Sequence, residues 1–200
     1  SAVQRILGIL LMVFSLTLIP PLIMALWLGD EALEAFATAF AITFGAGLAA
    51  WLPVRRRLKE LKLRDGFVVV VMFWTVLTLT GSLPFLLSPR PEISITDAVF
   101  ESVSGLTTTG ATVITGLDEL PRSILYYRQQ LQWLGGMGII VLAVAVLPML
   151  GIGGMQLYRA ETPGPMKDSK LTPRITETAK ALWYLYLALT LACILAYWGA

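Results

Sequence analysis

The sequence of 200 residues contains no histidine, a single cysteine and few charged residues. Without histidine the chain has no Ser-His-Asp or Cys-His catalysis and no His-ligated zinc. The lone Cys193 excludes an intrachain disulfide framework and a cysteine-rich metal site. Charged residues make up 14% of the chain, against roughly 25% in ordinary soluble domains. These absences argue against a soluble enzyme.

Apolar residues are abundant instead. They make up 56% of the chain, and the mean hydropathy is +0.75. Such a chain has too little polar surface to coat a compact globule in water. The 15 basic and 13 acidic residues leave a net charge of +2, which is too small to indicate a nucleic-acid partner. The composition therefore predicts a protein embedded in a lipid bilayer, with no nucleic acid bound and no enzymatic chemistry.

Uncharged runs divide the sequence, because an ionised side chain at the centre of a bilayer is costly. The six runs are Ile6–Leu28, Ala35–Val54, Gly66–Pro89, Ser102–Leu117, Gln129–Tyr158 and Ala181–Ala200. A helix needs about 20 apolar residues to cross the hydrocarbon layer, and five of the runs supply them. The remaining run, Ser102–Leu117, is shorter and rich in Ser, Thr and Gly. The pattern predicts an all-α, polytopic membrane protein with five crossings, the fourth starting at an interfacial cluster formed by Gln129, Gln130 and Gln132.

The distribution of charge predicts the orientation. Six of the fifteen basic residues lie in Arg55–Arg64 and five in Arg159–Lys180. The charged residues of Gly29–Glu34 are all acidic. The positive-inside rule places both basic segments and the N-terminus in the cytoplasm. Gly29–Glu34 and Arg90–Arg128 then lie outside. This count of crossings requires that Ser102–Leu117 enter the membrane and return on the same side.

The segment between the third and fourth crossings predicts a short helix over residues 94–105, followed by an extended loop over 107–112. Ser94 and Asp97 resemble a capping box at its start, and Gly105 suits its end. Irregular backbone at membrane depth is tolerated only where it is buried in protein or lines an aqueous cavity. The helix directs the negative end of its dipole at the loop, where Gly110 and its neighbours can present carbonyl oxygens to a cation. The alternative is an ordered extracellular loop.

Other polar and small residues in this region have simpler interpretations. Asp97 and Glu101 are expected to cap and pack the short helix rather than to relay protons. The glycines of the fourth crossing are expected to permit close helix packing; they are Gly135, Gly136 and Gly138.

Three segments carry a resemblance to a known family: Phe100–Thr112, Gln132–Ile139 and Gly153–Glu161. Together they resemble the TrkH family, the membrane subunits of bacterial Trk potassium uptake systems within the Trk/Ktr/HKT superfamily. The resemblance runs along essentially the whole chain. It implies a potassium-channel-like architecture of four membrane-pore-membrane repeats around one pore, preceded by two additional helices. It also implies site residues: Thr108, Thr109 and Gly110 match the filter stretch whose oxygens line the K+ site, flanked by Thr107 and Ala111.

The same resemblance implies a division of the chain. Residues 1–64 hold the two additional helices and a basic loop, and residues 65–158 form the first repeat. Residues 159–180 form a cytoplasmic loop, and residues 181–200 open the second repeat. The chain starts without Met and stops within an apolar run, so we expect it to be part of a larger protein.

The function implied by the resemblance is potassium uptake across the bacterial inner membrane, with K+ as the transported ligand and no organic cofactor. The implied partners are a second copy of the protein and a cytosolic, nucleotide-binding regulatory subunit of the TrkA type. Two alternatives stay open. The loop could be the substrate site of a secondary transporter coupled to H+ or Na+, or the chain could be a scaffold that transports nothing.

Overall fold

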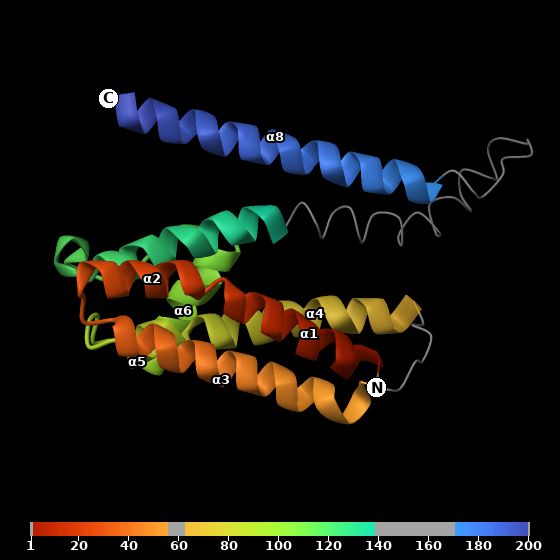
Figure 1. Cartoon of the computed structure of the whole chain (residues 1–200), viewed down its shortest axis with the longest axis horizontal. Helices are drawn as coiled ribbons and strands as arrows, with labels where there is room; N and C mark the ends of the chain where they lie inside the picture. The colour runs from red at the N-terminus through yellow and green to blue at the C-terminus, as the bar shows by residue number, and fades with distance from the viewer. Residues whose placement is uncertain (1, 56–62, 139–170, 200) are drawn as a thin grey trace, which may run out of the picture. The chain divides into compact units, whose positions relative to one another are not determined.

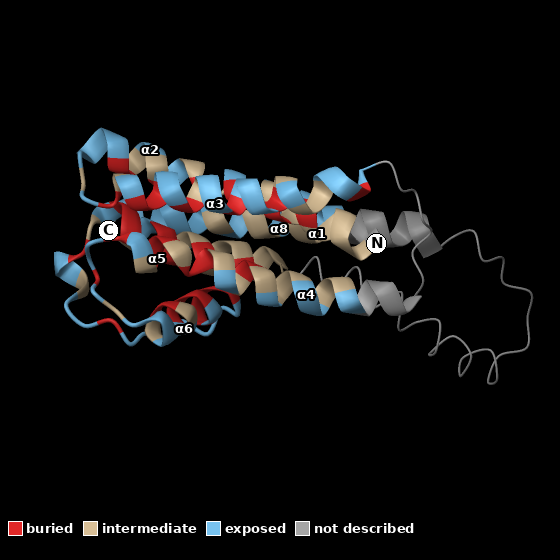
Figure 2. Ribbon diagram, turned by 90° about the horizontal axis from the view of Figure 1, so that it is seen from below, coloured by how far each residue is buried: buried red, intermediate tan, exposed pale blue. Residues whose placement is uncertain are grey.

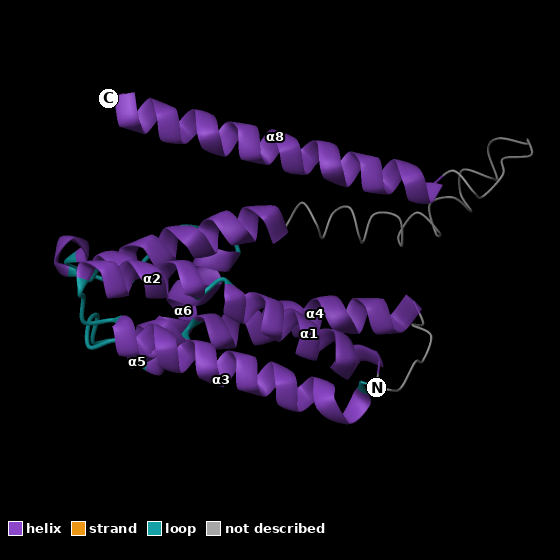
Figure 3. Cartoon of the chain, viewed as in Figure 1, coloured by secondary structure: helices purple, strands orange, loops and turns teal. Residues whose placement is uncertain are grey.

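The computed structural model describes residues 2–55, 63–138 and 171–199. These residues form helices joined by loops, and the described part of the chain contains no strand (Figure 3). The chain divides into two compact units, Ser1–Gly135 and Gly136–Ala200. The helical structure confirms the predicted all-α class.

The first unit is a bundle built around the first three long helices. Its elements are α1 (Ala2–Leu16), α2 (Ile19–Leu28), α3 (Leu33–Trp51), η1 (Leu52–Val54), α4 (Leu63–Gly81), α5 (Leu83–Leu87), α6 (Ile95–Leu106), η2 (Leu117–Glu119) and a helix over 122–138, of which the part up to Gly135 belongs to this unit. Helix α1 packs along α3 and also contacts α4, while the short α6 packs against α4 and α5 (Figure 1). A short helix is thus inserted between membrane-length ones.

Four described segments are long and apolar enough to span a membrane: Val3–Leu28, Leu33–Val54, Val68–Leu87 and Lys180–Gly199. They coincide with four of the five predicted crossings. Ser102–Leu117 contributes only the end of α6 and a loop, as its length predicted.

The fourth predicted crossing, Gln129–Tyr158, needs a correction at its start. The helix already begins at residue 122, so its first turns include Arg128 and Gln130. The side-chain amide of Gln130 donates a part-buried hydrogen bond to the carbonyl oxygen of Thr17, between α1 and α2. Taking a charged residue as the boundary of a crossing was the source of this error. Residues 139–158 lie outside the described part of the chain, as do Arg56–Lys62 and residues 159–170 of the two basic segments.

The first crossing is interrupted, which the uncharged run did not predict. Helix α1 ends at Leu16 and α2 begins at Ile19. Pro20 and Pro21 lack the N–H groups that would bond to carbonyls four residues earlier, so the helix cannot continue unbroken through this point.

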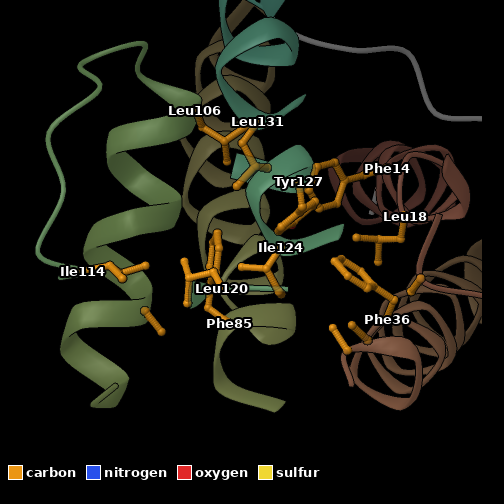
Figure 4. Close-up of a cluster of buried hydrophobic side chains, with 14 of the residues drawn as sticks. Phe14, Leu18, Phe36, Phe85, Leu106, Ile114, Leu120, Ile124, Tyr127 and Leu131 are labelled. Carbon is orange, nitrogen blue, oxygen red and sulfur yellow. The ribbon is translucent and has the colours of Figure 1, made fainter. Parts of the chain in front are cut away.

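Aromatic side chains hold the core of the first unit together. Tyr127 is fully buried. The centroid of its ring lies 5.4 Å from the ring centroid of Phe36 on α3 and 5.3 Å from that of Phe85 on α5. Leu106 at the end of α6 meets Leu131 on the 122–138 helix (Figure 4). The core therefore joins the N-terminal helices to the short helix.

The second unit contains α8 (Leu171–Gly199). None of the residues in its most apolar stretch is buried within the chain, and large apolar side chains such as Leu189, Leu191 and Ile194 are exposed. A helix that is apolar and uncovered in this way is suited to a lipid environment or to further protein.

Candidate ion-binding loop

The short helix α6 starts at a side-chain cap. Ser94 is the N-cap, and its Oγ accepts a hydrogen bond from the Asp97 N–H at 3.2 Å while its hydroxyl donates to Asp97 Oδ2 at 2.8 Å. This arrangement satisfies one of the free N–H groups at the helix start and places a carboxylate at the positive end of the dipole. The predicted helix over 94–105 and its cap are confirmed to within one residue.

Gly105 does not end α6, contrary to prediction. The helix continues to Leu106, with Thr107 as its C-cap. A Cβ at Gly105 would lie 2.9 Å from the Cβ of Leu131, and a Cβ at Gly135 would lie 2.2 Å from the Leu106 carbonyl oxygen. Both glycines therefore allow α6 and the 122–138 helix to cross closely, which confirms the packing role predicted for Gly135.

The backbone changes direction immediately after α6. Thr108 has a φ of 58° and Gly110 a φ of 72°, both in the left-handed region. The N–H groups of Thr109 and Gly110 both donate to the Ser104 carbonyl oxygen, at 2.9 and 3.3 Å. A β-branched residue such as Thr108 rarely adopts positive φ, and strain of this kind concentrates at functional sites.

The carbonyl oxygens of the loop fall into two groups. Those of the four residues Thr107–Gly110 accept no hydrogen bond from any residue that the structure describes. The next carbonyl, of Ala111, accepts one from the Ser104 hydroxyl at 2.6 Å. Residues 107–113 are all exposed on the unit (Figure 2). The predicted filter residues Thr108, Thr109 and Gly110 thus carry free backbone oxygens, while the flanking Ala111 oxygen is occupied.

A buried carboxylate holds the far end of the loop. Glu101 on α6 is 4% exposed. Its Oε1 accepts hydrogen bonds from the Thr112 hydroxyl at 2.5 Å and from the Val113 N–H at 2.8 Å, and its Oε2 accepts one from Arg128 Nε at 3.2 Å. Burying either charge alone would be costly, so each of the two buried side chains requires the other as its partner.

The sequence alone predicted that Glu101 helps to cap and pack the short helix, and it placed Arg128 in an outer loop. A carboxylate in the middle of a short apolar helix was the signal that a buried cationic partner was required. The spacing of 27 residues gives no indication of which arginine it is.

The loop is anchored beyond Glu101 as well. The Ile114 N–H donates to Thr112 Oγ1 at 3.1 Å, and the Ile114 side chain is buried in the core. A cavity of about 400 Å³ adjoins this end of the loop, lined in part by Asp97, Thr115 and Glu119.

The chemistry available in the loop is oxygen coordination. Among the described residues there is no group of three or more His, Cys, Asp or Glu side chains that could hold a metal ion. The donors present are backbone carbonyls and threonine hydroxyls, which suit a hard cation.

The predicted outer loops lie together. Asp30 Oδ2 accepts a hydrogen bond from the Ser123 N–H at 3.1 Å, and Glu31 lies 3.8 Å from Arg90 in an ion pair. Asp30 thereby caps the start of the 122–138 helix, where negative charge is favourable.

Comparison with known proteins places the chain in a family. The model of the TrkH family, described as cation transport proteins, matches residues 32–199. The Trk system potassium uptake protein TrkH of Halomonas elongata is 64% identical over 198 residues, covering 99% of this chain and 41% of that protein. The corresponding Escherichia coli protein is 59% identical, covering 100% of this chain and 41% of its own length.

A solved structure matches as well. The crystal structure of the potassium transporter TrkH from Vibrio parahaemolyticus superimposes with a TM-score of 0.81 and 57% sequence identity, over 98% of this chain and 38% of that one. The chain thus spans about two fifths of the length of the relatives it matches. Its short helix and loop between membrane-length helices form a membrane-pore-membrane unit, and the chain belongs to the TrkH family of cation transport proteins.

Proposed function

We propose that this chain supplies one part of the selectivity filter of a potassium uptake protein. Thr108, Thr109 and Gly110 would present their carbonyl oxygens to K+ in place of its hydration shell, with Thr107 and Ala111 flanking the site. The observation that carries this proposal is the row of exposed residues Thr107–Gly110 whose carbonyl oxygens accept no hydrogen bond from the described residues. The row ends where the Ser104 hydroxyl donates to the oxygen of Ala111. The relatives are named as potassium uptake proteins, which supports K+ as the ion.

The dipole of α6 supports the same conclusion. The helix has 12 residues and ends at Leu106, immediately before the free carbonyls. Its C-terminal end carries a partial negative charge, which favours a cation at the loop.

The complete pore requires more polypeptide than this chain, which covers 41% of its relatives. We place the protein in the bacterial inner membrane with its N-terminus in the cytoplasm, as a homodimer that binds a nucleotide-binding regulatory subunit of the TrkA type. The basic segments Arg55–Arg64 and Arg159–Lys180 would then face that subunit.

Reversing the charge of Lys167, Lys170 and Arg174 by substitution with Glu should weaken binding of the regulatory subunit, and most strongly at low salt. Equal affinity at all salt concentrations would contradict this contact.

The test of the filter is Gly110→Ser in the full-length protein. The nearest atom to a Cβ at Gly110 is 3.9 Å away, so the side chain fits but the φ of 72° becomes strained. Strain of about 1–3 kcal/mol at such a position corresponds to roughly a tenfold to hundredfold loss of preference for K+ over Na+.

Thr112→Ser is the matched control, because it keeps the hydroxyl that bonds to Glu101. Uptake of K+ and Na+ is measured at equal membrane abundance. If Gly110→Ser leaves the ion preference unchanged, the loop is an ordinary extracellular connection and the proposal fails. Uptake that stops without a proton or sodium gradient would identify coupled transport instead.

A further inference from the structure

We infer that Glu101 and Arg128 are positioning residues for the filter, and that their buried ion pair is a determinant of ion selectivity. The inference rests on the proposed function, since it assigns a role to residues behind the proposed K+ site. Neither side chain belongs to the free-carbonyl segment Thr107–Gly110.

Two residues on one face of α6, Glu101 and Ser104, hold the loop over residues 109–113. Glu101 and Ser104 are three residues apart and therefore project from the same side of the helix. Ser104 bonds to the backbone of residues 109–111 through its carbonyl oxygen and its hydroxyl. Glu101 bonds to the next two residues, Thr112 and Val113. Five consecutive residues are thus tied to α6.

These hydrogen bonds to α6 hold the loop backbone in a conformation that it does not favour by itself. Thr108 and Gly110 both have positive φ, which the segment keeps only while its surroundings determine it. A change at Thr112 or Val113 is therefore transmitted to Gly110, two or three residues away, and with it to the spacing of the carbonyl oxygens.

Arg128 acts through Glu101. The Arg128 side chain is 10% exposed and that of Glu101 is 3% exposed. A buried carboxylate without its cation is strongly disfavoured, so loss of Arg128 changes the position of Glu101. This change weakens its bonds to Thr112 and Val113. The 122–138 helix thereby sets the position of the filter from behind.

The experiment compares three variants of the full-length protein: Glu101→Gln, Arg128→Gln and Thr112→Val. Each is expected to lower the preference for K+ over Na+ by about tenfold, which corresponds to about 1.4 kcal/mol. The double variant of Glu101 and Arg128 should be no worse than either single one, because the two act as a unit. Arg128→Lys keeps the charge and should restore part of the preference.

Arg122→Gln is the matched control, since Arg122 is exposed on the same helix. The ratio of K+ to Na+ uptake is measured on purified protein reconstituted at equal amounts. The melting temperature of each variant is measured as well. A purely structural pair would lower the melting temperature and leave the ratio unchanged, which would overturn the inference. Thr112→Val removes one hydrogen bond and no charge. The ratio of K+ to Na+ uptake can therefore be measured on this variant even where the charge variants do not fold.

Gly110→Ser is measured in parallel. A changed ratio in Gly110→Ser with unchanged ratios in all three variants refutes only the role of the ion pair. Unchanged ratios in Gly110→Ser as well refute the proposed filter itself.

Discussion

The side-chain amide of Gln130 donates a hydrogen bond of 2.6 Å to the carbonyl oxygen of Thr17, across 113 positions of sequence. Pro21 stands four residues after Thr17 and has no N–H, so the helix itself leaves this oxygen without a donor. The 122–138 helix therefore supplies one of the hydrogen bonds that the prolines remove from the first crossing at the break between α1 and α2.

Gln130→Leu should destabilise the protein by about 1 kcal/mol, because the part-buried Thr17 carbonyl then loses its donor. The measurement is the thermal unfolding of the full-length protein in detergent. Gln129→Leu is the control, since Gln129 is exposed on the same helix. Equal melting temperatures for the two variants would show that the bond contributes nothing.

Tyr127→Phe isolates a second long-range bond. The buried Tyr127 hydroxyl donates to the Gly81 carbonyl oxygen at 2.9 Å, where α4 ends. Removing the hydroxyl keeps the ring contacts with Phe36 and Phe85 and should cost about 1 kcal/mol. The neighbouring Tyr126 is 42% exposed, so Tyr126→Phe should leave the melting temperature unchanged. A larger effect of Tyr126→Phe would contradict this assignment.

Gly135→Ala tests the crossing of α6 with the 122–138 helix. The added Cβ would meet the Leu106 carbonyl oxygen at 2.2 Å, and a backbone atom cannot move aside cheaply. We expect lower stability by about 1–3 kcal/mol, the usual cost of overpacking, together with reduced transport. Gly45→Ala is the control, because nothing lies within 4 Å of its added Cβ. That variant should be as stable as the parent or slightly more so.

Single cysteines test the membrane topology, in a Cys193→Ser background because Cys193 is exposed. Cysteines at Glu31 and Asp118 should react with an impermeant thiol reagent added outside the cell, and one at Arg55 should not. The contacts Asp30–Ser123 and Glu31–Arg90 motivate this expectation, since they bring the two outer loops together. Labelling of the cysteines at positions 55 and 118 from the same side would refute the five-crossing topology.

Much of the fold follows from local sequence. Ser94 and Asp97 predicted the start of α6 because capping depends on residues three positions apart. The long-range contacts did not follow in the same way. Glu101 needed a cation, but only the packed structure selects Arg128. Gly105 was assigned to a helix end on local grounds, whereas Leu131 on another helix determines its role. Pro20 and Pro21 did carry a signal for the break in the first crossing, which the uncharged-run criterion passed over.

The bond between Gln130 and Thr17 also has a consequence for the order of synthesis. Ribosomes add about 5–20 residues per second, so Gln130 follows Thr17 by roughly 6–23 s. Among the described contacts, the interrupted first helix is thus synthesised before this donor exists. A similar delay, of roughly 5–19 s, applies to Asp30, because Ser123 follows it by 93 positions. During that interval the N-terminal pair α1 and α3 depends on its own contacts, such as the close approach of Gly8 and Gly47.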